Sequence, residues 1–339
     1  MDEELFGSPS LYALSFQELE ELMKDESRYR SRQVWGHLYS KMDLPEEMTD
    51  LPLSLRARLK VLLPPALAEV ARVDSDAGET TKWSWELRDG ARIETVLMRY
   101  RDRATVCVST QAGCAMGCPF CATGQGGFKR NLLCEEILEQ VARAWRDLRP
   151  ERLTNVVFMG MGEPLANYSR VVESIRRLRD DFHLSPRRQS ISTVGIAPGI
   201  LRLATEGLPV TLAVSLHAAN DELRNRLVPM NKRYPLASVI NACERWVEET
   251  GRRLTFEWAM IDGVNDRPQD ASELATLAKP LGAHVNCISL NPTPGFGLSP
   301  SPPRAIKIFC EKLRSLGVNV TVRSTRGAGG HAACGQLSV

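Results

Sequence analysis

Short runs of β-branched and apolar residues alternate with longer stretches of helical periodicity from about residue 105 onward. The predicted strands are 105–109, 155–159, 190–193, 211–216, 255–260 and 285–290, and helical stretches lie at 134–147, 170–179, 236–249 and 270–280. Such alternation is typical of βαβ units, which build a parallel sheet covered by helices. Six repeats fit a curved or barrel-like α/β domain, with its chemistry at the carboxyl ends of the strands.

The first 75 residues carry a different pattern, which predicts a small helical unit. Ser15 and Glu18 have the spacing of a capping box, in which hydroxyl and carboxylate satisfy each other's backbone amides. Apolar residues at helical spacing follow from Phe16 to Leu22. The Pro64-Pro65 pair and the stretch 74–79 mark the end of this unit.

Residues 83–87 and 92–98 predict a β-hairpin, because both runs are strand-like and a turn containing Asp89-Gly90 joins them. Glu94 lies inside the second run. We therefore divide the chain into a helical unit (1–75), a hairpin extension (76–104), an α/β core (105–325) and a glycine-rich tail (326–339) that we expect to be mobile.

Composition narrows the class of protein. Of 339 residues, 43% are hydrophobic and 25% charged, which excludes disordered, collagen-like and coiled-coil proteins. The net charge of +2 excludes a polybasic coat for nucleic acid. Residues 120–235 nevertheless carry seventeen basic against twelve acidic side chains. This basic middle can face a polyanion, and it equally fits a solvated mixed surface.

Nothing in the sequence predicts export or a membrane span. The residues after Met1 are acidic and no apolar segment follows them, so a secretory signal is not expected. No stretch approaches 18 uninterrupted apolar residues. The nine cysteines are odd in number and unevenly spaced, which favours metal or thiol chemistry in a reducing compartment over a disulfide framework. We expect a cytoplasmic protein with no membrane contact.

The strongest chemical signal is a cluster of cysteines at positions 114, 118 and 121. Three thiolates so close together, directly after a predicted strand, form a compact site for a soft metal. A structural zinc site normally has four protein ligands, and no fourth Cys or His follows at comparable spacing. A [4Fe-4S] cluster held by three cysteines keeps one iron open. Buried structural cysteines and a zinc knuckle remain as alternatives.

The C-x3-C-x2-C spacing resembles the radical S-adenosylmethionine (SAM) superfamily. In that superfamily the open iron chelates the amino and carboxylate groups of SAM, and the reduced cluster cleaves SAM to a 5′-deoxyadenosyl radical. Met159-Gly-Met-Gly162-Glu163-Pro164 resembles its glycine-rich SAM-binding segment. Glycine permits close backbone approach there, and a carboxylate can meet the SAM ammonium.

Further motifs resemble one family within the superfamily, RlmN and its relative Cfr. These are radical SAM methyltransferases that act on adenine of ribosomal RNA. The similarity covers most of residues 80–339, with an RlmN-like helical unit in front of it. The motifs are Cys107-Val-Ser-Thr-Gln-Ala-Gly-Cys114, Gly126-Gly-Phe-Lys-Arg-Asn-Leu132, Ser215-Leu-His217, Asn291-Pro-Thr-Pro294 and Ala332-Ala-Cys334-Gly-Gln-Leu337.

The resemblance implies an α/β fold, namely a partial (βα)6 radical SAM barrel with a small helical N-terminal domain and a β-hairpin extension. It also implies roles for residues that match the motifs. Cys334 would carry the methyl group, Cys107 would be its resolving partner, and Glu94 would accept a proton. Cys114, Cys118 and Cys121 would bind the cluster. The SAM site would be lined by Gly162, Glu163, Ser192, Ser215, Leu216, His217 and Asn291.

The target carbon explains why such a mechanism is needed. Carbon 2 of adenine lies between two ring nitrogens and is too electron-poor to attack the methyl group of SAM. The resemblance implies that one SAM methylates the Cys334 thiolate, and that a radical from a second SAM abstracts hydrogen from this S-methyl group. The carbon radical adds to the ring. Proton loss and attack by Cys107 on the Cys334 sulfur then release the product and leave a disulfide.

Without the family, several of these residues have simpler interpretations. Glu94 would be an outward-facing strand residue, and Cys107 a buried small hydrophobe. Cys134, Cys243, Cys287 and Cys310 lie in apolar or helical patterns and are expected in the core. The stretch 329–331, Gly-Gly-His, departs from the acidic and apolar pair common in the family, which bears on tail conformation more than on chemistry.

The predicted substrate is an unstacked adenine in RNA. Basic residues at 129–130, 176–179, 187–188 and 224–233 can bind phosphate, although each group equally fits a solvated helix face. We expect methylation of carbon 2 of an adenine in 23S rRNA and of the adenine 3′ to the anticodon in tRNA. We also expect the protein to be a monomer that receives electrons from a flavodoxin-type donor. The alternatives are Cfr-like methylation at carbon 8, a radical SAM enzyme with another substrate, and a zinc-stabilised RNA-binding module without catalysis.

Overall fold

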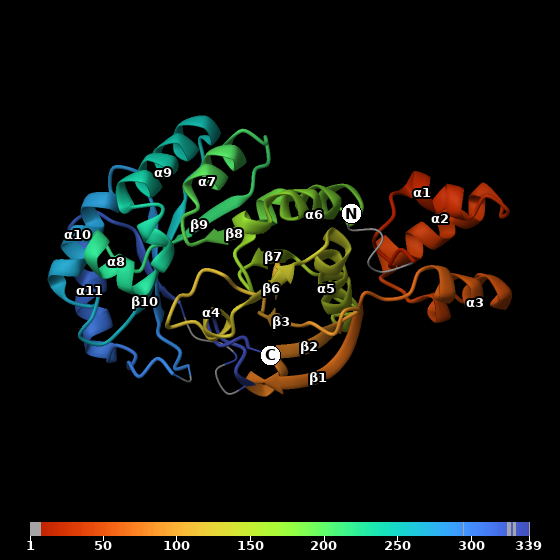
Figure 1. Ribbon diagram of the computed structural model, residues 1–339, viewed down its shortest axis with the longest axis horizontal. Helices are drawn as coiled ribbons and strands as arrows, with labels where there is room; N and C mark the ends of the chain where they lie inside the picture. The colour runs from red at the N-terminus through yellow and green to blue at the C-terminus, as the bar shows by residue number, and fades with distance from the viewer. Residues whose placement is uncertain (1–7, 294, 324–326, 328–329, 339) are drawn as a thin grey trace.

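The computed structural model describes residues 8–293, 295–323, 327 and 330–338. Its centre is one sheet, whose strands are hydrogen-bonded in chain order (Figure 1). They are β1 (Leu67–Ser75), β2 (Thr80–Leu87), β3 (Arg92–Arg99), β4 (Ala104–Cys107), β7 (Asn155–Phe158), β8 (Gln189–Thr193), β9 (Thr211–Ser215), β10 (Thr255–Met260), β11 (His284–Ser289) and β12 (Val320–Arg323). A separate ribbon pairs β5 (Gln111–Gly113) with β6 (Phe128–Asn131).

The sheet changes direction at β4. Strands β1 to β4 pair antiparallel, whereas every pairing from β4 to β12 is parallel. β4 and β7 to β11 are the six predicted strands, so the α/β class and the curved parallel core are confirmed. β12 is a further parallel strand that the hydrophobic pattern missed, because Thr321 and Val322 in its middle are exposed.

Helices cover the outer side of the parallel strands (Figure 1). They are α5 (Cys134–Asp147), α6 (Tyr168–Asp180), α7 (Ala197–Ala204), α8 (Asp221–Leu227), α9 (Leu236–Thr250), α10 (Pro268–Ala278) and α11 (Pro303–Ser315). The predicted helical stretches correspond to α5, α6, α9 and α10. The four cysteines assigned to the core, at 134, 243, 287 and 310, are all buried.

Short elements complete the chain. The one-turn helix α4 (Ala122–Gln125) follows the cysteine motif. Short 3-10 turns lie at Pro45–Glu47, Asp76–Gly78, Pro164–Asn167, Pro186–Arg188 and Pro229–Lys232. Within the described ranges, none of the helices combines the length and apolarity that crossing a bilayer requires.

The N-terminal unit is helical, as predicted. It contains α1 (Phe16–Leu22), α2 (Arg28–Gly36) with a π-helical extension at His37–Lys41, and α3 (Leu53–Leu62). The predicted capping box is present: the Glu18 amide donates to the Ser15 hydroxyl (3.3 Å), and the Ser15 amide donates to the Glu18 carboxylate (2.7 Å). This unit lies beside α5 and α6, at the far side from α10 (Figure 1).

The prediction that residues up to 75 are helical is wrong for residues 67–75, which form strand β1. Most of β1 is exposed, so no buried alternation marks it in the sequence. Its conformation comes from pairing with β2 over its whole length. Arg72 also lies 5.5 Å above the Trp83 ring and pairs with Asp147 of α5 at 2.5 Å. Tertiary pairing therefore overrides weak local preference.

Arg177 of α6 ties the N-terminal segment to the barrel. Its guanidinium donates to the carbonyl oxygens of Tyr12 (2.6 Å) and Leu14 (2.8 Å) and to the Tyr39 hydroxyl (2.5 Å). The Asp181 carboxylate accepts from its Nε at 2.8 Å. Hydrogen bonds from a charged group are among the stronger ones.

We predict that Arg177→Met lowers the free energy of unfolding by about 3 kcal/mol, because it leaves buried acceptors without a donor. Limited proteolysis should then cleave within residues 8–63 before the barrel. Arg179→Met is the matched control: Arg179 pairs with Asp180 on the surface, where an ion pair contributes no more than about 1 kcal/mol. Equal effects of the two substitutions would contradict the assigned role of Arg177.

Candidate active site

A cavity of about 170 Å³ opens at the carboxyl ends of the parallel strands. The predicted residues that line it are Cys114, Cys118, Cys121, Gly162, Glu163, Ser192, Ser215, His217, Asn291 and Cys334. A smaller adjoining cavity, of about 40 Å³, is lined by Cys107, Asn291 and Cys334. The fold therefore brings together residues that are up to 227 positions apart in the chain.

The three motif cysteines are held by the turn between β5 and α4. The Cys114 amide donates to the Gly127 carbonyl (2.8 Å), and Gly113 allows this approach, because a Cβ there would lie 2.0 Å from the Gly127 oxygen. Met116 and Leu290 pack with Cys118 in a small apolar cluster. Burial raises the pKa of the Cys114 thiol to about 12 and also raises the pKa of Cys118. Both thiols need a nearby cation to ionise.

This donor set fits an iron–sulfur cluster. Thiolates suit iron–sulfur clusters, and iron would supply the positive charge that buried thiols need. Among the described residues, no group of three or more His, Cys, Asp or Glu side chains is arranged to hold a metal ion. Cysteines that bind different irons of one cluster do not have to converge on a single point.

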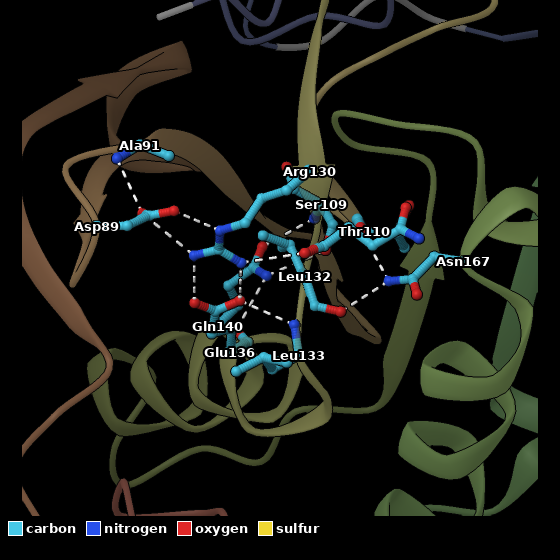
Figure 2. A network of polar contacts seen from close by, with 11 residues as sticks. Asp89, Ala91, Ser109, Thr110, Arg130, Leu132, Leu133, Glu136, Gln140 and Asn167 are labelled. Atoms are coloured by element: carbon cyan, nitrogen blue, oxygen red, sulfur yellow. Dashed lines mark hydrogen bonds and ion pairs between the residues drawn. The ribbon is translucent and has the colours of Figure 1, made fainter. Parts of the chain in front are cut away.

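Figure 2 shows a polar network that joins Ser109, Thr110 and Arg130 to the hairpin turn at Asp89 and to α5. Gln140 of α5 accepts from the Ser109 amide (2.8 Å) and donates to the Ser109 carbonyl (3.1 Å). The Ser109 hydroxyl donates to the Glu94 carbonyl (2.6 Å) and accepts from the Met161 amide (2.9 Å). Ser109, between β4 and β5, thus links β3, α5 and the glycine-rich segment after β7 at one buried point.

Arg130, in the motif at 126–132, belongs to the same network. Its guanidinium pairs with Asp89 in the hairpin turn (2.5 Å) and with Glu136 of α5 (2.8 Å) (Figure 2). Arg224 is fully buried and donates to Asn231 and to the Val194 carbonyl, both at 2.6 Å. The expectation that Arg224 contacts phosphate is wrong, because internal acceptors hold its guanidinium. Arg187 and Arg188 remain exposed.

The segment after β7 has the close backbone packing predicted for its glycines. Gly162 has φ +99°, and a Cβ there would lie 2.5 Å from the Gln111 side chain. Glu163 is buried, and its carboxylate accepts from the amides of Val194 (2.8 Å) and Leu165 (3.0 Å). Burial raises the pKa of Glu163 to about 7. The cavity thus contains a carboxylate that an ammonium group would stabilise.

His217 and its neighbours form another wall of the cavity. His217 has φ +61°, and its Nδ1 accepts from the Ala259 amide at 3.0 Å. Burial, with a smaller effect of Arg224, lowers the pKa of His217 to about 3, so the ring is neutral. The hydroxyls of Ser192 and Ser215 lie 3.4 Å apart. The side chain of Leu216, predicted to line the SAM site, is instead buried in the hydrophobic core.

The described part of the tail is docked at the cavity. The Cys334 carbonyl accepts from Asn291 Nδ2 (2.9 Å), and the Gly335 carbonyl accepts from the Ala122 amide (2.7 Å). The Leu337 carbonyl accepts from the Thr123 hydroxyl (2.6 Å). Gly330 packs against Ser75: a Cβ added at Gly330 would lie 3.2 Å from the Ser75 hydroxyl oxygen. Gly329 of the stretch that departs from the family pattern, and Pro294 of the motif at 291–294, lie outside the described residues.

Cys334 is exposed, whereas Cys107 is buried at the end of β4, and both are free thiols. Burial raises the pKa of Cys107 to about 12. Arg323 of β12 lines both cavities, and attraction to Cys334 raises the pKa of this guanidinium. The sequence analysis missed Arg323 because it missed the strand that carries it.

Glu94 of β3 contacts the tail through Ser338. It is 2% exposed, so the interpretation as an outward-facing strand residue is wrong. Its Oε1 lies 2.8 Å from Lys82 Nζ and 3.1 Å from the Ser84 hydroxyl, and its Oε2 accepts from the Ser338 amide at 2.8 Å. Lys82 and Ser84 carried no signal in the sequence, because they are ordinary strand residues there.

We predict that His217 makes the stability of the metal-free protein pH-dependent. The unfolded chain binds one more proton than the folded chain between the folded pKa of about 3 and the unfolded value of about 6.5. The stability contributed is present above pH 6.5 and is lost as the pH falls toward 3. Relative to His217→Asn, wild type should lose about 2 kcal/mol between pH 7.5 and 5.

Chemical unfolding of both proteins across this pH range measures the difference. Asn tolerates a positive φ, and its carbonyl oxygen can accept the Ala259 amide in place of Nδ1. A gap between wild type and variant that does not change with pH would show that His217 is not buried in the neutral form.

Comparisons with known proteins agree with the geometry. Residues 108–275 match the model of the Radical SAM superfamily. The chain is 50% identical to a probable dual-specificity RNA methyltransferase RlmN from Parafrankia sp. (strain EAN1pec), over 94% of this chain and 91% of the relative. It is 49% identical to a protein of the same name from Corynebacterium diphtheriae, over 92% of this chain and 88% of the relative.

A solved structure shares almost the whole fold. The crystal structure of a radical SAM methyltransferase from Sphaerobacter thermophilus covers 97% of this chain at 48% identity, with a TM-score of 0.93, and this chain covers 99% of that protein. The maturase HydG, at 12% identity and a TM-score of 0.51, shares the fold alone. These similarities favour a radical SAM methyltransferase over a non-catalytic zinc module. The chain belongs to the RlmN family of radical SAM RNA methyltransferases.

Proposed function

We propose that this protein methylates carbon 2 of an adenine in 23S rRNA and of the adenine 3′ to the anticodon in tRNA, with Cys334 as the methyl carrier. The observation that carries this proposal is the placement of Cys334. It lines the cavity of the three motif cysteines and also the adjoining cavity that contains Cys107. A methyl group accepted at its sulfur would therefore lie between the radical site and the second thiol.

Cys114, Cys118 and Cys121 would hold the [4Fe-4S] cluster, and the residues around them would hold SAM. When bound, the cluster supplies the electron that cleaves SAM to a radical able to abstract hydrogen. Glu163 would meet the SAM ammonium, and the hydroxyls of Ser192 and Ser215 would hydrogen-bond the cofactor. Because His217 is neutral, it can line the SAM site without placing a positive charge beside the SAM sulfonium.

Cys334 and Arg323 account for the first methyl transfer. A thiolate attacks the methyl group of SAM far faster than a thiol. Arg323 lines the same cavity as Cys334 and is electrostatically coupled to it, so its guanidinium would stabilise the thiolate. Asn291, which holds the Cys334 carbonyl at 2.9 Å, would fix the sulfur's position.

Cys107 and Glu94 account for release of the product. Glu94 would accept the proton from the attacked carbon, and Cys107 would attack the Cys334 sulfur. The raised pKa of Cys107, about 12 because of burial, means that its thiol is protonated in this arrangement. Attack therefore requires a change that exposes the thiol or brings a positive charge nearer, as movement of Arg323 or of the tail would.

The RNA must present an unstacked adenine to this cavity. Arg187 and Arg188 are exposed at the amino end of β8, the opposite end of the strand from the cavity, so we assign them no contact with this RNA. The proposal includes a cytoplasmic monomer that receives electrons from a flavodoxin-type donor. Cfr-like methylation at carbon 8 would use the same cysteines, so it is an outcome that the experiment must distinguish.

We predict that reconstituted wild-type protein, with SAM and reductant, converts 23S rRNA fragments and tRNA to 2-methyladenosine. Cys334→Ala should lower product at least 1000-fold, because no other nucleophile replaces the methyl-carrying sulfur. Mass spectrometry of digested RNA against carbon-2 and carbon-8 standards gives the position. Methylation at carbon 8 would show that the protein carries out the Cfr-like reaction instead. Product formed by Cys334→Ala would show that Cys334 is not the methyl carrier.

We predict that Cys107→Ala stops the reaction one step later. The RNA should remain covalently attached to Cys334, because no thiol is available to release it. Denaturing gel electrophoresis of labelled RNA should show this adduct with Cys107→Ala and not with Cys310→Ala, a buried cysteine of α11. Free methylated RNA from Cys107→Ala at the wild-type rate would exclude Cys107 as the resolving thiol.

A further inference from the structure

Lys82 of β2 makes two contacts that the proposed function does not explain. Its ammonium lies 2.8 Å from Glu94 Oε1 and donates to the His331 carbonyl at 3.2 Å. The Lys82 side chain is only 12% exposed. A buried lysine needs both a counter-charge and acceptors, and here the carboxylate and the tail carbonyl supply them.

Strand register explains why Lys82 and Glu94 meet. Ser84 lies directly opposite Glu94, and Lys82 lies opposite Val96, in the antiparallel pairing of β2 with β3. Lys82 is therefore the diagonal neighbour of Glu94 on the same face of the hairpin. Val96 and Met98 of this face line the small cavity with Cys107 and Cys334. The hairpin face that carries the ion pair thus faces the two reactive thiols.

The ion pair contacts the tail on both sides of Cys334. Lys82 holds the carbonyl of His331, three residues before Cys334, and Glu94 Oε2 holds the amide of Ser338, four residues after it. The tail segment 331–338 is therefore clamped at both ends by one pair of opposite charges.

The docked tail also covers the carboxylate that the proposed function needs. Glu94 is 2% exposed, Lys82 and Ser84 occupy one of its oxygens, and Ser338 occupies the other. An adenine can approach Oε2 only after Ser338 leaves it. Lys82 and Ser84 are on the hairpin rather than on the tail, so their contacts can persist when the tail moves.

We propose that Lys82 and Glu94 form a latch that holds the Cys334-bearing tail, and that Lys82 keeps the Glu94 carboxylate in position to accept the adenine proton once Ser338 is released. Lys82 is thus a positioning residue. The proton moves from carbon 2 of the attached adenine to Glu94 Oε2, so that Glu94 becomes a neutral acid beside Lys82. The electron pair of the C–H bond stays in the ring adduct. The unpaired electron of the adduct would pass to a one-electron acceptor, and the oxidised [4Fe-4S] cluster of the proposed function would serve as that acceptor. The role of Lys82 in positioning Glu94 for proton transfer rests on the proposed function, whereas the latch does not.

The latch is tested on the protein alone by hydrogen–deuterium exchange. Lys82→Met should raise the exchange rate of amides in 331–338, including Ser338, by about tenfold. Lys82→Arg, which keeps the charge and the donors, should restore most of the protection. Lys60→Met in α3 of the N-terminal unit is the matched control and should leave the tail unchanged.

A double substitution tests whether Lys82 acts through Glu94. Glu94→Gln keeps an acceptor for Ser338 but loses the charge, so Lys82→Met should add little to tail exchange in a Glu94→Gln background. Fully additive effects, or unchanged tail exchange in Lys82→Met, would overturn the latch. Retained binding of SAM by each variant shows that the protein is folded.

The positioning role is tested with RNA deuterated at carbon 2 of the target adenine. In Lys82→Met, SAM-dependent methylation of Cys334 should proceed within about twofold of wild type, whereas release of methylated RNA should slow at least tenfold. The deuterium isotope effect on release should be larger than in wild type, because proton transfer has become slower. A merely structural role would leave this isotope effect unchanged, and that result would overturn the assignment.

The two arms separate failure of the inference from failure of the proposed function. If wild-type protein makes no methyladenosine, the proposed function is wrong and the proton-positioning role of Lys82 falls with it. The exchange measurement still decides whether Lys82 and Glu94 hold the tail. If wild-type protein methylates RNA and Lys82→Met releases product at the same rate, only the positioning role is wrong.

Discussion

The antiparallel pairing of β3 with β4 is the constraint on which the site depends. It joins the N-terminal hairpin to the edge of the parallel sheet and sets Val96 opposite Cys107. The resulting face carries Glu94, and also Val96 and Met98, which line the small cavity with Cys107 and Cys334. The tail contacts both this face and α4. Ser109 strengthens the junction, since its hydroxyl bonds both the Glu94 carbonyl and the Met161 amide. Without this hairpin the tail would lose its contacts with Lys82 and Glu94.

Burial determines the protonation of the groups around the cavity. It raises the pKa of Cys107 and of Cys114 to about 12 and the pKa of Glu163 to about 7, and it lowers the pKa of His217 to about 3. Burial shifts each of these groups toward its neutral form. A cationic cofactor would ionise Glu163 and a cluster would ionise the thiols. Binding and ionisation are therefore coupled at this site.

In the proposed mechanism, tail docking and proton acceptance by Glu94 would compete for the same carboxylate oxygen, Oε2. With Ser338 on Glu94 Oε2, Cys334 lines the larger cavity. Under the proposal, release of Ser338 would open Glu94 to the RNA base, and one ion pair would then order the two halves of the reaction without a separate lid. The N-terminal unit is fixed independently through Arg177, so tail movement need not disturb it.

The sequence by itself determined the α/β class, the six parallel strands and the three clustered thiols, because these depend on local periodicity and spacing. It identified Cys107, Cys334 and Glu94 only through resemblance, and it could not place them side by side. Strands β1 and β12 and the side chains Lys82, Ser84 and Arg323 escaped it, since an exposed edge strand has no hydrophobic pattern and a strand lysine has no motif. The roles of these side chains depend on strand register and on contacts between residues more than 200 positions apart in the chain, which only the tertiary structure decides.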